Sequence, residues 1–282
     1  MARCLVLENY SVERAGDSCL ATLEAWEDKV VEAFAGIVRT AFPGSGFRRT
    51  GTPRPGFLGF QQQLRLTGAI PGDGIRQVEA FLELVSRCLT IEDLLDESHA
   101  LAYHQEQDEE TGQLIKTRLG RLVNQAKYKT YRQPREAVGN AVIEFIKGHP
   151  RYSRATAIAC MPPHGTGKRS SLSARVVNQV REALQLEEAI IVRTKSRPAQ
   201  KDITDDDRRV GVKKRIANQK HSMRADTDLR GKAVIIIDDL YGSGGSMQEA
   251  ARVSREAGAS EVLGLSITKQ RLFEGVSLVL GS

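Results

Sequence analysis

The stretch Val234–Ser246, VIIIDDLYGSGGS, decides the fold of this chain and the position of its functional site. The run of Val and Ile predicts a strand that is buried on both faces, as in a parallel sheet. The strand ends at Asp238 and Asp239, and small residues then form a loop that opens a helix. Ser246, with Glu249 three residues later, predicts a capping box at the start of that helix.

The loop Gly242–Ser246 has the composition of an anion site. Glycines let the backbone approach a phosphate closely, and the N–H groups and dipole of a helix N-terminus favour an anion. The carboxylates of Asp238 and Asp239 suit neighbouring hydroxyl groups, such as those of ribose. The segment therefore predicts a ribose 5′-phosphate site. The alternative is a plain strand-turn-helix corner, although two adjacent carboxylates repel each other unless donors or cations offset them.

Apolar segments alternate with helical ones around this motif. Strands are expected over Ala155–Cys160, Ala189–Val192, Ala233–Ile237, Val262–Ile267 and Val276–Leu280, and helices over Ser171–Leu184 and Ser246–Ala257. This alternation predicts an α/β fold, a parallel sheet flanked by helices. In such sheets ligands bind at the carboxyl ends of the strands.

The first part of the chain has a helical bias. Helices are expected over Thr22–Ala41, Ile75–Cys88 and Ile91–Tyr103, with a loop over the Gly-, Pro- and Arg-rich residues 43–59. The acidic run Gln105–Gly112 has no apolar side chain and predicts a linker. It would join a mainly helical domain, residues 1–112, to an α/β domain, residues 113–282. The alternative is a β-hairpin turn, with Leu101–Tyr103 pairing with Leu114–Lys116.

Composition excludes several classes of protein. The 282 residues, 40% hydrophobic and 27% charged, are enough for one or two globular cores. No run approaches the roughly 20 apolar residues of a membrane helix, and Met1–Leu7 does not resemble a secretory signal. Four cysteines without a CxxC pair favour a reduced, cytoplasmic location. The 5% aromatic content makes extended base stacking a weak prospect.

Positive charge is concentrated in one stretch. Arg193–Arg224 holds eleven Lys or Arg and four Asp, a net charge of +7, whereas the whole chain carries +6. A mobile basic loop that closes over a polyanionic ligand would have this composition. A solvated charged loop is the alternative.

The motif VIIIDDLYGSGGS resembles the phosphoribosyl-pyrophosphate (PRPP) signature of type I phosphoribosyltransferases, and most of all their ComF-like, competence-associated branch. Three other segments resemble the same family in the same order. Leu119–Tyr131 (LGRLVNQAKYKTY) resembles a helix that leads to a Lys-Tyr pair. Ile158–His164 (IACMPPH) resembles the first strand and the pyrophosphate loop, and Val192–Lys201 (VRTKSRPAQK) resembles the start of the hood over the active site. The resemblance covers roughly residues 113–282 and implies a type I phosphoribosyltransferase-like sheet there.

The resemblance also implies roles for individual residues. The implied ribose and 5′-phosphate site comprises Asp238, Asp239, Leu240, Tyr241, Gly242, Ser243, Gly244, Gly245 and Ser246, with Gly242 and Ser243 standing where the family commonly has threonines. The implied pyrophosphate site comprises Met161, Pro162, Pro163, His164, Arg193, Arg197 and Lys201. The implied catalytic residues are Asp238, Asp239, Arg193 and Lys195. Arg215 with Asn218 resembles the R-x-x-N of the hood, and Arg208 is the alternative counterpart.

The function that the resemblance implies is transfer of phosphoribose from PRPP to a base or another nucleophile, with release of pyrophosphate. Magnesium is the expected cofactor. It would be held through PRPP, and Asp238 and Asp239 are the only candidates for direct protein ligands. The alternatives are a non-catalytic sensor of PRPP or another ribonucleoside 5′-phosphate, and a bacterial defence effector docked onto a partner. Residues 1–112 are the candidate contact for a protein or nucleic-acid partner, and the sequence leaves the acceptor and a homo-oligomeric state open.

Overall fold

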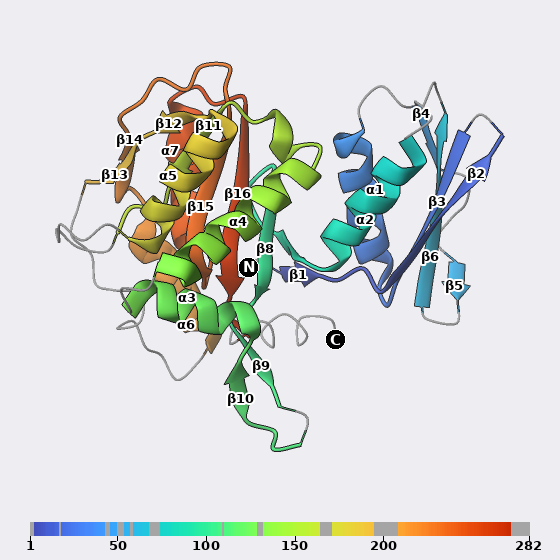
Figure 1. Cartoon of the computed structure of the whole chain (residues 1–282), viewed down its shortest axis with the longest axis horizontal. Helices are drawn as coiled ribbons and strands as arrows, with labels where there is room; N and C mark the ends of the chain where they lie inside the picture. Colours follow the sequence, from blue (N-terminus) through green and yellow to red (C-terminus); the bar gives the residue numbers. More distant parts are fainter. Residues whose placement is uncertain are drawn as a thin grey trace. The chain divides into compact units, whose positions relative to one another are not determined.

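Strand β15 (Ala233–Tyr241) lies inside a mostly parallel sheet in the computed structural model of the chain (Figure 1). It pairs in parallel with β11 (Ala157–Cys160) on one side and with β16 (Glu261–Lys269) on the other. Residues Val234–Ile237 are fully buried, since helices on both faces leave no solvent-facing side to the strand. The structure describes residues 3–16, 18–42, 46–49, 54–56, 59–67, 74–108, 110–128, 132–163, 171–194 and 208–271.

The sheet has the strand order β1-β7-β8-β16-β15-β11-β12 in the described residues. β8 (Glu97–Tyr103) runs parallel to β16, and β12 (Glu187–Ala189) runs parallel to β11. β1 (Arg3–Leu5) and β7 (Leu89–Glu92) lie at the other edge. A separate antiparallel pair is formed by β13 (Ile191–Arg193) and β14 (Met223–Ala225).

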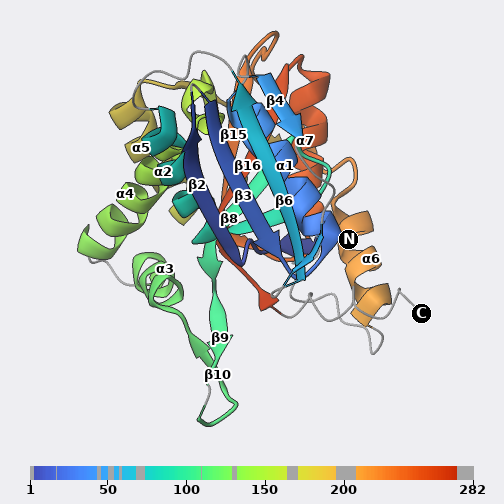
Figure 2. The same cartoon turned by 90° about the vertical axis from the view of Figure 1, so that its right-hand side faces the viewer.

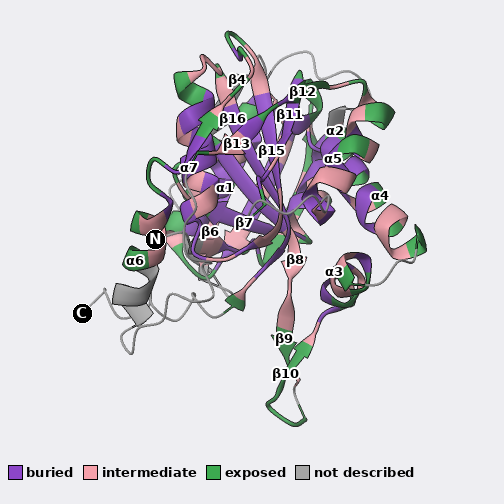
Figure 3. Cartoon of the chain, turned by 90° about the vertical axis from the view of Figure 1, so that its left-hand side faces the viewer, coloured by how far each residue is buried: buried purple, intermediate pink, exposed green. Residues whose placement is uncertain are grey.

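Helices α5 (Leu172–Leu184) and α7 (Gly245–Glu256) lie on opposite sides of the sheet (Figure 3). α3 (Arg118–Tyr128) packs against α5, β8 and β16, and α6 (Arg208–Gln219) packs against α7. α4 (Arg132–Gly148) and the short 3-10 helix η1 (Tyr152–Arg154) precede β11. The predicted α/β fold is therefore confirmed, although the expected strand over 189–192 is divided between β12 and β13. The expected strand over 276–280 falls outside the described residues.

The chain divides into two compact units that are not contiguous in sequence. One unit contains residues 1–4, 91–144 and 154–282, and the other contains residues 5–90 and 145–153. The predicted boundary at residue 112 does not coincide with this division, because β8 pairs with β16.

The smaller unit is not mainly helical, so that part of the prediction is wrong. Its sheet has the order β2-β3-β6-β4, with β5 pairing to β6 (Figure 2). Two helices pack against it, α1 (Asp28–Ala41) and α2 (Gly74–Ser86), and together they enclose an apolar core. The strands are β2 (Asn9–Ala15), β3 (Ser18–Ala25), β4 (Gly46–Arg49), β5 (Arg54–Gly56) and β6 (Gly59–Thr67).

Strand β3 explains the error. The helix expected over Thr22–Ala41 begins only at Asp28, because the residues before it alternate strictly between buried and half-buried positions. Small side chains hide this period of two in the sequence SCLATLEA. Trp26 precedes the helix and is 61% exposed.

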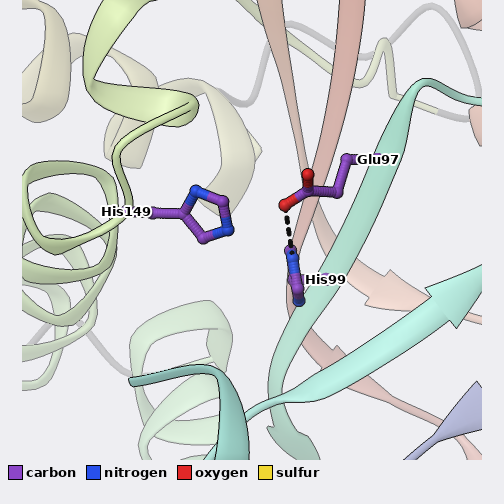
Figure 4. A group of neighbouring side chains, drawn as sticks. All are labelled: Glu97, His99 and His149. Atoms are coloured by element: carbon purple, nitrogen blue, oxygen red, sulfur yellow. Dashed lines mark hydrogen bonds and ion pairs between the residues drawn. The ribbon is translucent and has the colours of Figure 1, made fainter. Parts of the chain in front are cut away.

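The helix expected over Ile91–Tyr103 is also wrong, since this segment contains the end of β7 and the whole of β8. Polar side chains at buried positions of β8 obscured the strand. Glu97 and His99 lie two residues apart, on one face of the strand. His99 Nε2 lies 2.8 Å from Glu97 Oε1, so these two buried side chains are hydrogen-bonded to each other (Figure 4).

The acidic run Gln105–Gly112 belongs to a β-hairpin, as in the alternative interpretation, but the first strand of that hairpin is not the one expected. β9 (Gln105–Gln107) pairs with β10 (Leu114–Lys116) in an antiparallel arrangement. Asp108 Oδ1 accepts hydrogen bonds from the backbone N–H and the hydroxyl of Thr111, and Gly112 adopts a φ of +66°. β10 therefore pairs with Gln105–Gln107 and not with the expected Leu101–Tyr103, which belong to β8. None of the described helices has the length and apolar character needed to cross a membrane.

Candidate functional site

The carboxyl ends of β11, β15 and β16 lie side by side because the three strands are parallel and adjacent. Cys160 is in register with Ile237, and the N–H of Met161 donates to the carbonyl of Ile237 over 2.8 Å. The expected pyrophosphate loop therefore starts beside Asp238. Of its residues, Met161 and Pro162 are buried and Pro163 is exposed, whereas His164 lies outside the described residues.

The two carboxylates of the acidic pair differ in their partners. Asp239 Oδ1 lies 2.9 Å from Lys127 Nζ, at the last turn of α3. Asp238 has no ion pair among the described residues, and its Oδ1 accepts the backbone N–H of Asp239 over 2.8 Å. Burial, and next the neighbouring Asp239, raise the pKa of Asp238 to about 7. A nearby cation or additional hydrogen-bond donors would therefore stabilise the ionised form of Asp238.

The N-terminal end of helix α3 is fixed against the end of β8. Thr117 caps the helix, since its hydroxyl accepts the N–H of Gly120 over 3.0 Å and donates to the carbonyl of Tyr103 over 2.6 Å. A Cβ at Gly120 would lie 2.1 Å from the carbonyl oxygen of His104, so the helix touches the end of β8 backbone to backbone. This contact sets the position from which Lys127 reaches Asp239.

A hydrogen-bond chain supports Asp239 from the other side. The hydroxyl of Thr268 donates to the carbonyl of Asp239 over 3.0 Å, and His104 Nδ1 lies 3.2 Å from that hydroxyl. Burial lowers the pKa of His104, as do the charges of Lys116 and Lys127. A neutral His104 therefore orients Thr268 without adding charge to the site.

The small-residue loop leads into α7, but the expected capping box is wrong. The N-cap residue is Gly244, with a φ of +82°, and it offers no side chain to the first N–H groups of the helix. The hydroxyl of Ser246 donates instead to Gln219 Oε1 over 3.3 Å. Glu249 accepts the N–H groups of Ser222 and Met223 and pairs with Arg252. The first N–H groups of α7 therefore receive no hydrogen bond from the side chain of an N-cap residue.

Tyr241 fixes the shape of this loop. A Cβ at Gly244 would lie 2.4 Å from the Tyr241 hydroxyl oxygen, so glycine is required there for space as well as for its positive φ. The hydroxyl donates to Asp93 Oδ2 over 3.0 Å, and Asp93 Oδ1 accepts from Leu95 N–H and the Ser98 hydroxyl. Burial raises the pKa of Asp93 above its usual value, and these donors oppose the shift.

Arg193 brings a second set of contacts to the same edge. Its Nε donates to the carbonyl of Pro163 over 3.1 Å, and its Nη1 donates to Gln219 Oε1 over 2.9 Å. Its Nη2 is buried and has no hydrogen-bond partner in the described part of the chain. Burial lowers the pKa of Arg193, whereas the charge of Asp238 raises it. The guanidinium is therefore anchored on two sides and keeps one donor for a further acceptor.

The hood is described only in part. Lys195, Arg197 and Lys201 lie outside the described residues, so their expected roles have no structural account. Arg215 and Asn218 lie in α6, which also includes the backbone of Arg208. α6 packs on the start of α7, since a Cβ at Gly245 would lie 2.9 Å from the Cα of Ile216.

Several of these residues were missed by sequence reasoning. Lys127 was seen only as part of a Lys-Tyr pair, and nothing in the sequence connects it with Asp239. Asp93 and Gln219 belong to no motif, and only the fold brings them to the loop and to Arg193. A lysine in the last turn of a helix is favourable because it interacts with the negative end of the helix dipole. Many lysines share this position, so it is only a weak signal for a functional residue.

Comparisons with known proteins agree with the class that the resemblance implied. Residues 172–265, about a third of the chain, match the family model of the phosphoribosyl transferase domain. The match includes β15, the acidic pair, the loop and α7. A search of curated proteins finds no match.

Solved structures of low sequence identity also resemble the chain. The APRTase from Giardia lamblia, complexed with 9-deazaadenine, is 15% identical, with 62% of this chain and 85% of that one covered and a TM-score of 0.35. The purine phosphoribosyltransferase from Pyrococcus horikoshii is 13% identical, with 48% and 82% covered and a TM-score of 0.31. The phosphoribosylpyrophosphate synthetase from Mycobacterium smegmatis is 20% identical, with 47% of this chain covered and a TM-score of 0.31. This chain spans only 33% of the length of that synthetase.

Proposed function

We propose that the chain binds PRPP and transfers its phosphoribosyl group to a nucleophile, with release of pyrophosphate, as a relative of the ComF-like branch of type I phosphoribosyltransferases. The observation that carries this proposal is the acidic pair at the end of β15, followed at once by the uncapped N-terminus of α7. Both lie in the segment that matches the phosphoribosyl transferase family model.

The proposed binding mode follows the chemistry along the strand edge. The carboxylates of Asp238 and Asp239 accept the ribose hydroxyls, and the N–H groups of Gly242–Ser246 donate to the 5′-phosphate. Arg193 faces the pyrophosphate group with its unpartnered Nη2, next to Met161–Pro163. In this binding mode the 5′-phosphate faces backbone N–H donors, and the pyrophosphate group faces the positive charge of Arg193.

The site also suits magnesium as the cofactor. The carboxyl group of Asp238 is half-buried, has no ion pair among the described residues and has a raised pKa. A hard divalent cation bound beside it would stabilise its ionised form. Bound together with PRPP, magnesium would neutralise charge on the departing pyrophosphate. The residues of this chain would orient the ribose through Asp238 and Asp239, and Arg193 would stabilise the negative charge that grows on the leaving group.

Thermal unfolding tests the binding site. PRPP at 100 times its Kd adds about 2.7 kcal/mol, which corresponds to roughly 5 to 10 °C for a chain of this size. The double variant Asp238→Asn with Asp239→Asn should remain folded and lose the shift. Asp228→Asn is the matched control, because this exposed carboxylate pairs with Arg230 and lies outside the proposed site. A full shift in the double variant would refute the ribose assignment.

Turnover separates the proposed transferase from a sensor or a defence effector that only binds the ligand. Pyrophosphate release from PRPP with a panel of bases should be lowered by Arg193→Ala more than PRPP binding is, because charge on the leaving group grows in the transition state. Binding without release of pyrophosphate would favour the sensor. A protein or nucleic-acid partner held through residues 1–112 remains part of the proposal for the effector.

A further inference from the structure

A cavity of about 270 Å³ lies between α3 and β10, and no proposed step of the transfer reaction uses it. We call it the α3 pocket. Its lining residues are polar or aromatic and come from two elements in one compact unit: Lys116, Arg121, Asn124, Gln125 and Tyr128.

The pocket lies along one face of α3. Arg121, Asn124, Gln125 and Tyr128 follow each other at helical spacing, so their side chains share a face. The buried residues Gly120, Val123 and Ala126 occupy the opposite side, and Lys127 is directed to Asp239. The pocket is therefore separate from the acidic pair, although one helix serves both.

Among the described paired residues of the hairpin, no carboxylate lies on the same face as Lys116. Residues directly opposite in an antiparallel pair share a face, so Lys116 and Leu114 lie on the same face as Gln105 and Gln107. Glu106 is opposite Ile115 and lies on the other face. Lys116 and Arg121 form no ion pair in the described part of the chain, so the pocket presents two uncompensated positive charges.

The arrangement is fixed rather than accidental. Arg121 Nη1 donates to the carbonyl of Lys116 over 2.7 Å and joins the helix to the strand. Thr117, between them in sequence, is tied to the carbonyl of Tyr103. The aromatic ring of Tyr128 nevertheless remains 80% exposed at the end of this face.

We propose that the α3 pocket binds a nucleotide unit of single-stranded nucleic acid. Lys116 and Arg121 would contact phosphates, the amides of Asn124 and Gln125 would meet the edge of an unpaired base, and the ring of Tyr128 would stack on its face. An acidic peptide would use the two cations but would leave the ring and both amides without a role. A duplex keeps its bases stacked on each other and away from Tyr128.

Fluorescence anisotropy of the full chain with fluorescein-labelled 12-nucleotide single strands, one RNA and one DNA of the same sequence, tests the proposal. Tyr128→Ala should weaken binding about tenfold, whereas Tyr128→Phe keeps the ring and should bind like the parent. A 2-aminopurine base in the strand should be quenched by the parent and by Tyr128→Phe only. Lys116→Gln with Arg121→Gln should reduce the slope of log K against log salt by about 1.4, the value for two phosphate contacts.

Matched controls keep the result specific. Trp26→Ala removes another exposed ring and Lys147→Gln another exposed cation, and both should bind like the parent. The thermal response to PRPP should persist in all pocket variants, since none of these residues belongs to the proposed transfer site. Unchanged affinity and salt slope in the pocket variants would overturn the proposal. Equal competition by a duplex, or displacement by polyglutamate together with unchanged binding by Tyr128→Ala, would overturn it as well.

Discussion

At the scale of single residues, the acidic pair shows how two identical neighbours acquire different properties. Asp239 is neutralised by Lys127 and is supported through its backbone by Thr268. Asp238 accepts backbone N–H groups from Asp239 and Leu240 but has no ion pair among the described residues, and burial raises its pKa to about 7. The folded protein therefore holds a carboxyl group that is costly to ionise, at the position where we propose that a ligand binds.

This cost predicts how stability depends on pH. The ordinary pKa of an aspartate in the unfolded chain is about 3.9, so between pH 4 and 7 the folded state binds more protons at Asp238 than the unfolded state does. Stability therefore falls as the pH rises through this window. Asp238→Asn keeps the acceptor for the N–H of Asp239 but cannot ionise. It should be more stable than the parent at pH 8, by on the order of 2 kcal/mol.

Urea unfolding at pH 4.5, 6 and 8 measures the difference, which should shrink toward zero at the lowest pH. Asp228→Asn serves as the control. Its exposed carboxylate pairs with Arg230, which lowers its pKa, so this variant should give no such gain at pH 8. A difference that stays constant with pH would contradict the shifted pKa of Asp238.

At the scale of elements, the position of α3 depends on close contact at Gly120. The backbone of the helix at Gly120 lies against the carbonyl oxygen of His104, and a Cβ at Gly120 would clash with that oxygen. The proposed ribose site and the α3 pocket both depend on this contact, because the direction of the helix sets the positions of the Lys127 and Tyr128 side chains.

Two glycine variants test this dependence. Alanine is the better helix former by about 1 kcal/mol, so Gly36→Ala in α1, where a Cβ meets nothing within 4 Å, should raise stability. Gly120→Ala should lower it by about 1 to 3 kcal/mol, since the helix must move away from His104. Thermal unfolding of the two variants decides the point. Equal gains in both would mean that α3 is not held at Gly120.

The elements that sequence reasoning located are those with an unbroken apolar run or a clear helical period. β15, β16, α5 and α7 are of this kind, and the acidic pair stands out because it interrupts such a run. β3 was missed because its buried residues are as small as Cys19 and Ala21, and β8 because it buries Glu97 and His99. Pairings between distant segments, such as Tyr241 with Asp93, have no sequence signature and follow only from the fold.

At the scale of the whole molecule, the sheet joins segments that lie far apart in the chain. β8 precedes the hairpin, yet it pairs with β16 near the end of the described residues. A cut in the hairpin therefore separates two pieces of one sheet. The contiguous domains 1–112 and 113–282 remain a proposal about which fragments fold alone.

Limited proteolysis distinguishes these views. A Glu-specific protease should cut the hairpin at the exposed Glu110. The two fragments should then co-elute in size-exclusion chromatography under native conditions, because β8 remains paired with β16, and they should separate only in denaturant. If the fragment that begins at residue 111 elutes alone and still responds to PRPP, the contiguous domains would be correct.

The pairing of β8 with β16 also has a consequence for synthesis of the protein. The backbone N–H of Val262 bonds to Asp96 across 166 residues, and a ribosome adds about 5 to 20 residues per second. β8 must therefore wait on the order of ten seconds or more for its neighbour to be translated. Because β16 lies between β8 and β15, translation that stopped before Glu261 would release a chain with two open strand edges facing the same gap, a form prone to aggregate.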